Sequence, residues 1–278
     1  MEASLKIMYG FCNIMAIPIR ATASHRAEMV TQLLFGEAYK ITDYRHTSGW
    51  AEIETQYDDY KGFMDINQIS LIHQSTYEQY EKNLFEVAPV PMSIFDKKRN
   101  FVFPISAGST LLLNEENSMR LGSELFEIQR FPAQEKTDLK QIAYSFLNTP
   151  YLWGGRTMHG MDCSGFTQIV FKIMGKKLPR DASQQAVLGE KIPSISQTQC
   201  GDLAFFQNKE GRITHTGIIL DSQTIIHASG KVRIDRLDKQ GIFCTERNEY
   251  SHILHSARNI IAKNTPSSQI HYRNNINP

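Results

Sequence analysis

The segment GMDCSGF, residues 160–166, places a cysteine between an acid and a Ser-Gly pair, directly before an apolar run. Asp162 is a residue type that commonly caps a helix, so Cys163 is predicted in the first helical turn. Unpaired N–H groups and the helix dipole favour a thiolate there, lowering a cysteine pKa from about 8.5 towards roughly 4–7. The Cys163 N–H could also donate to the oxygen of an attacked carbonyl. Because most free cysteines are buried and inert, the segment by itself still favours an inert thiol, with a nucleophile as the alternative.

A nucleophilic thiol needs a base, usually a histidine, and a third group that orients the base. His215 in ITHTGIIL and His227 in TIIHAS flank DSQ, which is typical of the turn of a β-hairpin. Their even separation puts both side chains on one face, opposite each other or one diagonal apart, with Cβ atoms about 5–8 Å apart. His215 is therefore predicted to face the thiol, and His227 to fix its tautomer. The histidines at 25, 46, 73, 159, 252 and 255 lack such a relation to a nucleophile.

A metal is the rival chemistry for the same residues. Cys163, His215 and His227 could form a three-ligand zinc site with one open position. However, a helix N-terminus repels a cation, and no nearby acid is placed as the base of a zinc site. A catalytic thiol without metal or other cofactor is therefore favoured, with zinc as the alternative.

The composition limits the class of protein. The chain has 278 residues, of which 41% are hydrophobic, so a globular body with real cores is expected. A formal charge of +1 gives no overall field for nucleic acid or for acidic membranes, and no apolar stretch approaches the ~20 residues of a membrane-spanning helix. The four cysteines (Cys12, Cys163, Cys200 and Cys244) contain no CxxC pair, which predicts free thiols.

The N-terminal stretch IMYGFCNIMAIPIRATA, residues 7–23, superficially resembles a signal peptide. Glu2 offsets the charge of Lys6, Asn13 and Pro18 interrupt the apolar run, and an arginine adjoins the supposed cleavage site. A cytoplasmic location is therefore expected, with export as the alternative.

Two β units are expected before the cysteine. Residues 1–74 read as short strands at the spacing of a small barrel. Residues 75–135 read as a partly helical connector and a second small β unit, in which Pro89, Pro91 and Pro104 confine strands to edges or strand starts.

The pattern changes in residues 136–262. TDLKQIAYSFL and DCSGFTQIVFKIMG have apolar residues at helical spacing, and Gly175 marks the end of the second helix. Strands then follow in GDLAFF, THTGIIL, TIIHAS, VRIDRL and HILHSARNI, so an α+β domain with an antiparallel sheet is expected. The polar tail, residues 263–278, is predicted to be disordered.

Four stretches between residues 137 and 262 carry a family resemblance: TPYLWGGRTMHGMDCSGF, LPRDASQQ, GDLAFF and HTGIIL…IIHAS. In this order they resemble the NlpC-like family of papain-type cysteine peptidases, which cut bacterial cell-wall peptides. The resemblance implies Cys163 as nucleophile, His215 as base and His227 as the third polar residue. It also implies that Tyr151 of the Y-x-W-G-G motif lies close to the nucleophile.

The preceding β units resemble bacterial SH3-like domains, and IRATASHRAEMVTQLLFGE, GWAEI and GF are similar to the first such domain of one subgroup. Its members are γ-D-glutamyl-L-diamino acid endopeptidases that act on free murein peptides with an N-terminal L-Ala. The resemblance implies hydrolysis of L-Ala-γ-D-Glu-(L-diamino acid) during cell-wall recycling. It also implies two small SH3-like barrels before a papain-like α+β domain.

A peptide pocket is implied by the same resemblance. An acid near the ammonium group and a base near the carboxylate would suit a zwitterionic dipeptide. The implied residues are aromatic walls, polar contacts and two closing residues of the first SH3-like domain: Tyr151, Trp153, Asp162, Ser164, Arg180, Asp181, Glu28 and Tyr60.

Two other functions stay open at this point. One is a non-catalytic cell-wall-binding protein, against which the intact Cys–His–His set argues. The other is a secreted hydrolase of polymeric peptidoglycan. The length of the peptides that the protein cleaves would distinguish this function from cleavage of free murein peptides. A pocket closed by Glu28 and Tyr60 should reject peptides whose L-Ala nitrogen is acylated.

Overall fold

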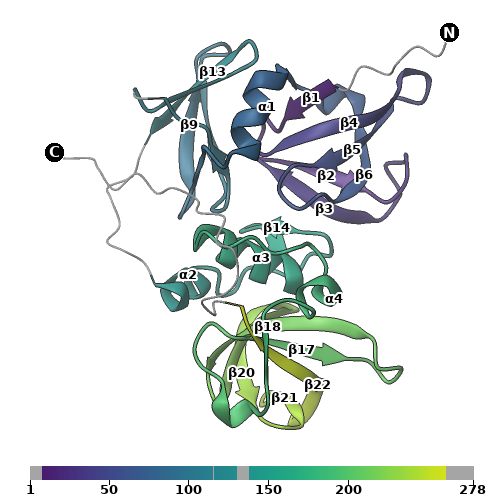
Figure 1. The fold of residues 1–278 in the computed structure, drawn as a ribbon, viewed down its shortest axis with the longest axis vertical. Coiled ribbons are helices and arrows are strands. Elements are labelled where there is room, and N and C mark those ends of the chain that lie inside the picture. Colours follow the sequence, from purple (N-terminus) through teal and green to yellow (C-terminus); the bar gives the residue numbers. More distant parts are fainter. Residues whose placement is uncertain (1–7, 115, 130–137, 261–278) are drawn as a thin grey trace. The chain divides into compact units, whose positions relative to one another are not determined.

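The computed structural model describes residues 8–114, 116–129 and 138–260, which form two compact units, residues 8–129 and 138–260 (Figure 1). The predicted disordered tail at 263–278 lies outside the described residues. No helix in the described ranges is long and apolar enough to cross a membrane.

The first unit begins with an antiparallel sheet in the strand order β3-β2-β6-β5-β4-β1-β7. Buried and half-buried residues alternate along β2 and β5, as expected where one face of a strand meets a core. The buried face forms an apolar cluster that includes Ile17, Tyr39, Ile53 and Met64. The strands are β1 (Met8–Phe11), β2 (Ala16–Arg20), β3 (Met29–Leu34), β4 (Ala38–Arg45), β5 (Trp50–Thr55), β6 (Lys61–Asp65) and β7 (Leu71–Ile72).

A four-stranded sheet and a two-stranded sheet complete this unit, in the orders β10-β9-β13-β12 and β11-β8. Pro104 lies on β10, an edge strand, which confirms its predicted placement. The elements are α1 (Gln74–Glu81), β8 (Glu86–Val87), β9 (Met92–Asp96), β10 (Phe101–Ile105), β11 (Thr110–Leu111), β12 (Ser118–Leu121) and β13 (Glu124–Gln129).

The two halves of the first unit share a core. Phe35 packs edge-on against Phe126, with ring centroids 5.1 Å apart. The Thr110 N–H donates to the Phe35 carbonyl at 2.9 Å. Gly36 adopts φ 77°, and a Cβ there would lie 1.8 Å from the Thr110 oxygen, so the backbone contact requires glycine. These contacts explain why both halves form one compact unit.

The second unit contains an antiparallel sheet that closes on itself. Its order is β16-β22-β17-β18-β19-β20-β21, and β21 pairs with β22 as well as with β20. Strands β17 to β22 therefore form a complete circle. The elements are α2 (Leu139–Ser145), β14 (Arg156–Thr157), β15 (Gly160–Met161), α3 (Cys163–Ile173), α4 (Ala182–Gln185), β16 (Glu190–Ile192), β17 (Leu203–Gln207), β18 (Ile213–Asp221), β19 (Thr224–Ser229), β20 (Lys231–Leu237), β21 (Gly241–Cys244) and β22 (Glu249–Asn259).

Helices α2, α3 and α4 lie on one side of this sheet (Figure 1). Every residue of α3 is buried, because the helix packs against β18 and β19 as well as against α2 and α4. Gly175, at φ 74°, follows its end, as predicted. The architecture is a β-rich region followed by an α+β domain, in the predicted order. This packing brings the start of α3 to β18, the strand that carries His215.

Candidate active site

The start of α3 is held by Asp162, which confirms the predicted cap. Its Oδ1 accepts the Gly165 N–H at 2.7 Å, and its Oδ2 accepts the Gly154 N–H at 2.8 Å. A Cβ on Gly165 would lie 2.3 Å from the Gly155 carbonyl oxygen, so this glycine makes room for the backbone of the WGG loop. Cys163 therefore occupies the first position of a helix whose start is tied to the preceding loop.

Three of the predicted peptide-contacting residues bond to one another inside the domain. Arg180 is only 2% exposed and donates to Oδ1 of Asp162 at 3.0 Å and to Oγ of Ser164 at 2.9 Å. A second hydrogen bond runs from Arg180 to Oδ2 of Asp162. A bidentate pair of this kind satisfies a buried carboxylate that would otherwise be costly. The structure thus assigns these residues a role in holding the helix start, and their contact with a peptide stays a prediction.

The expected low pKa of Cys163 is wrong. Burial and the neighbouring Asp162 carboxylate raise the pKa of the thiol to about 12, against the lowering effects of the Thr216 backbone N–H and of Arg180. A thiolate inside the domain loses hydration that the helix start does not replace. The Thr216 amide also places the sulfur beside β18, next in sequence to His215. Cys163 is therefore a thiol at rest and needs a base to become a nucleophile.

We expect alkylation of Cys163 by iodoacetamide to accelerate about tenfold per pH unit from about pH 6 to 9, because only the thiolate reacts. A raised pKa leaves the thiol protonated across this range, so the thiolate fraction grows with each unit. Peptide mass spectrometry separates Cys163 from the exposed Cys200. Glutathione in the same series provides an ordinary thiol. A rate for Cys163 that is constant from about pH 6 to 8 would instead indicate a thiolate–imidazolium pair.

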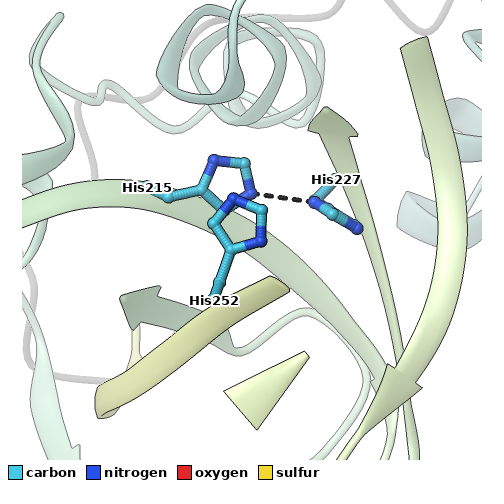
Figure 2. Close-up of side chains that lie close together, drawn as sticks. All are labelled: His215, His227 and His252. Carbon is cyan, nitrogen blue, oxygen red and sulfur yellow. Dashed lines mark hydrogen bonds between the residues drawn. The ribbon is translucent and has the colours of Figure 1, made fainter. Parts of the chain in front are cut away.

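His215 and His227 lie one diagonal apart, which is one of the two predicted arrangements. Ile218 pairs with Ile226, so His227 lies opposite Gly217, two residues beyond His215. Nε2 of His215 is 2.8 Å from Nδ1 of His227, and both rings are buried (Figure 2). A Cβ on Gly217 would come within 2.8 Å of the His227 Cβ, so glycine opposite His227 admits the ring. The predicted hydrogen bond between the imidazoles is confirmed.

Burial keeps both imidazoles neutral. It lowers the pKa of His215 well below its ordinary value, and the neighbouring His227 and His252 lower it further. Burial also lowers the pKa of His227, although Asp235 opposes this effect. A neutral imidazole has one nitrogen that accepts a proton. His215 is therefore in the protonation state that a general base requires.

Two residues beside His227 were not anticipated from the sequence. Oδ2 of Asp235 lies 2.9 Å from Nε2 of His227, and Arg233 forms an ion pair with the same carboxylate, its Nε 2.7 Å from Oδ2. Both belong to β20, in VRIDRL, where alternate residues share a face. The alternation indicates that Arg233 and Asp235 share a face of β20, but it does not show which strands β20 pairs with.

His252 was wrongly set aside with the other histidines. Its ring stacks on that of His215, with centroids 4.0 Å apart and planes 23° apart (Figure 2). It comes from β22, which joins the circle beside β17 and β21, and its pKa is lowered to about 4 by burial and by His227. His252 thus covers one face of His215 as a neutral ring.

The three histidines also form the candidate metal cluster of the described ranges, with ring nitrogens within 4.8 Å of one another. The geometry fits zinc poorly. Lone pairs lie in the ring planes, so the stacked rings of His215 and His252 do not aim at one point. Both nitrogens of His227 are already occupied, by His215 and by Asp235. The cluster is better suited to passing hydrogen bonds than to holding an ion.

The other predicted site residues are spread over both units. Tyr151 is half-buried near Cys163, and burial and that thiol raise its pKa. Trp153 is 58% exposed, and the Asp181 N–H donates to Oε1 of Gln184 at the start of α4. The exposed Glu28 and the half-buried Tyr60 belong to the first unit, directly before β3 and β6. Closure of the pocket by these last two residues stays a prediction.

The two matches to known protein families lie in different units of the chain. Residues 148–246 match the NlpC/P60 family, and residues 19–69 match the bacterial dipeptidyl-peptidase SH3 domain. The chain carries an NlpC/P60 domain behind a bacterial SH3 domain. The NlpC/P60 match includes Cys163, His215 and His227, together with Arg233 and Asp235.

The chain is 41% identical over 93 residues to the γ-D-glutamyl-L-lysine dipeptidyl-peptidase of Bacillus subtilis, covering 33% of this chain and 31% of that protein. It is 33% identical over 99 residues to a Bacillus cereus protein of the same name, covering 35% and 29%. The matches thus span about a third of each relative. A crystal structure of an NlpC/P60 family protein from Bacillus cereus matches with a TM-score of 0.72 and 20% identity, covering 91% of this chain and 99% of that one. At this identity the similarity shows the fold.

Proposed function

We propose that the protein is a cysteine peptidase that hydrolyses the γ-D-glutamyl-L-diamino acid bond of murein peptides with a free N-terminal L-Ala. One observation carries the proposal: a thiol at the start of α3 lies beside the strand of a neutral, hydrogen-bonded histidine pair. Such an arrangement supplies a nucleophile, a base and an orienting group.

The reaction follows from these groups. His215 takes the Cys163 proton while the sulfur attacks the γ-carbonyl carbon, and the Cys163 N–H donates to the developing oxyanion. The C–N bond then breaks, and His215 returns the proton to the leaving amine of the diamino acid. Water attacks the resulting thioester, again giving a proton to His215. L-Ala-D-Glu leaves, and the thiol is restored.

The substrate assignment is supported by two kinds of likeness. The names of the two Bacillus relatives state a γ-D-glutamyl-L-lysine bond. The proposed requirement for a free amine rests on Glu28 of the SH3 domain, whose carboxylate would pair with the ammonium group of L-Ala. An acylated amine has no charge for this pair, so polymeric or capped peptides should be poor substrates.

The test is hydrolysis of L-Ala-γ-D-Glu-L-Lys and of its meso-diaminopimelate analogue, each with a free and with an acetylated amino terminus, followed by mass spectrometry. We expect L-Ala-D-Glu from the free peptides and at least about tenfold slower cleavage of the acetylated ones, as for loss of one charge-assisted pair. Glu28→Gln should reduce this preference. Glu81→Gln is the matched control, an exposed glutamate on α1 of the same unit.

The outcomes separate the alternatives. No cleavage of any of these peptides would refute the substrate assignment. Equal cleavage of free and acetylated peptides would instead support a hydrolase of polymeric peptidoglycan and would remove the role proposed for Glu28.

A further inference from the structure

The histidine pair continues into a third strand. His215 on β18 bonds to His227 on β19, and His227 bonds to Asp235 on β20. His227 lies directly opposite Arg233, so Asp235 is one diagonal step further, as His227 is from His215. All three side chains are buried. Two equal diagonal steps across three neighbouring strands thus make one continuous line of hydrogen bonds.

The far end of this line is a carboxylate with a fixed orientation. Arg233 donates from Nη2 to Oδ1 at 2.9 Å, and its Nε lies 2.7 Å from Oδ2. Although burial alone would raise the pKa of Asp235, hydrogen bonds from His227 and Arg233 lower it, so the group is ionised. The guanidinium is itself held by the exposed Glu246 at 3.0 Å. An ionised carboxylate can only accept hydrogen bonds.

The direction of every bond in the line then follows. Because Asp235 only accepts, Nε2 of His227 must carry a hydrogen. Since His227 is neutral, its Nδ1 is bare and must accept from His215. Nε2 of His215 therefore carries the other hydrogen, and Nδ1 is the nitrogen left to take a proton. Figure 2 shows this second nitrogen of His215 on the side away from His227.

We propose that Asp235, oriented by Arg233, is a positioning residue that sets the tautomers of both histidines and so makes Nδ1 of His215 the catalytic base. Its carboxylate contacts His227 and Arg233, so it acts through His227. The role rests on the proposed catalytic function of Cys163 and His215. The opposite tautomers would present an N–H where the thiol proton must go.

The size of the expected effect follows from the charges. Asp235 is paired with Arg233, so the two groups together add no net charge behind His227. Their contribution is orientation rather than stabilisation of an imidazolium by a free anion. Loss of the orienting partner of a metal-bound histidine costs about 10- to 100-fold, and an Asp→Asn change that leaves a triad histidine in the wrong tautomer costs about 10⁴-fold in kcat. We therefore expect a loss of about 10²- to 10⁴-fold for Asp235→Asn.

The decisive variant is Asp235→Asn. Oδ1 accepts a hydrogen bond from Nη2 of Arg233, whereas Nε of Arg233 makes no hydrogen bond to a described residue, so the amide oxygen of the variant is expected at the Oδ1 position and its NH2 toward His227. With the NH2 toward His227, Nε2 must accept and both histidines change tautomer. The matched control is Asp238→Asn, in the turn after β20, where the carboxylate accepts from the Tyr250 hydroxyl instead.

The first measurement uses the unsubstituted full chain and needs no substrate. Nitrogen-15 NMR of labelled histidine distinguishes Nδ1–H from Nε2–H tautomers at neutral pH. We expect His215 and His227 both as Nε2–H. Finding His227 as Nδ1–H in the native protein would overturn the proposal, whichever peptide the protein cleaves.

The second measurement compares the variants with the native protein. For Asp235→Asn we expect changed tautomers of both histidines and an about 10²- to 10⁴-fold lower kcat, with KM within about twofold. Asp238→Asn should alter neither. Normal tautomers with normal kcat, or reduced kcat with normal tautomers, would each contradict the role of Asp235. If no proposed peptide is cleaved, labelling of Cys163 by a peptide-like electrophile replaces kcat, so failure of the substrate assignment remains distinguishable.

Discussion

Replacement of Cys163 by alanine is expected to reduce hydrolysis of L-Ala-γ-D-Glu-L-Lys by roughly 10⁴- to 10⁶-fold, the range seen when a covalent nucleophile is removed. The variant keeps the helix cap and the histidine pair, because the hydrogen bonds that form them do not involve the Cys163 side chain. Peptide binding should therefore survive. Mass spectrometry gives the rate, and calorimetric titration with the same peptide gives the affinity.

Cys163→Ser extends this test to the pairing of nucleophile and base. A serine hydroxyl has a far higher pKa than a thiol, and the lowered pKa of His215 makes this imidazole a weak base. We therefore expect Cys163→Ser to be nearly as inactive as the alanine variant. Cys200→Ala, which removes the exposed cysteine before β17, is the matched control and should retain full activity. Substantial turnover by Cys163→Ala would exclude the covalent mechanism.

Arg180→Met is expected to destabilise the NlpC/P60 domain by about 3–5 kcal/mol, because it leaves the buried Asp162 carboxylate without its cation. The loss should be concentrated at the start of α3, where Asp162 holds the Gly165 N–H. Hydrogen exchange of peptides covering 163–173 gives the free energy of local opening. We predict that this free energy of local opening falls in Arg180→Met.

Two comparisons make this prediction specific. Arg247→Met removes an arginine paired with Glu249 in the same domain, but both side chains are 58% exposed, so we expect about 1 kcal/mol or less. Combining Arg180→Met with Asp162→Asn should recover part of the loss, since the second change removes the unpaired charge. Unchanged exchange with a raised KM would mean that Arg180 serves the peptide rather than the helix start.

Much of the chemistry could be read from local pattern. The cap at Asp162 depends on the residue itself and on the helix that follows, so sequence alone identifies it. The even spacing of His215 and His227 predicted their shared face, but this face also depends on the register of the hairpin. The turn pairs Asp221 with Thr224, a register that by itself would set His227 opposite Ile218, on the other face from His215. The bulge between Ile219 and Asp221 shifts the pairing by one residue, so that His227 lies opposite Gly217 and shares the face of His215.

The sequence by itself determined the capped helix start that carries Cys163, because the cap depends only on residues close together in the chain. Tertiary structure alone decided which other residues surround the site. Asp235 and His252 reach the site because a closed circle of strands brings β20 and β22 to it, and pairing between distant segments is not visible locally. It also decided the charge state of Cys163. Burial and the Asp162 carboxylate outweigh the helix start, and both depend on what the folded chain packs around the sulfur.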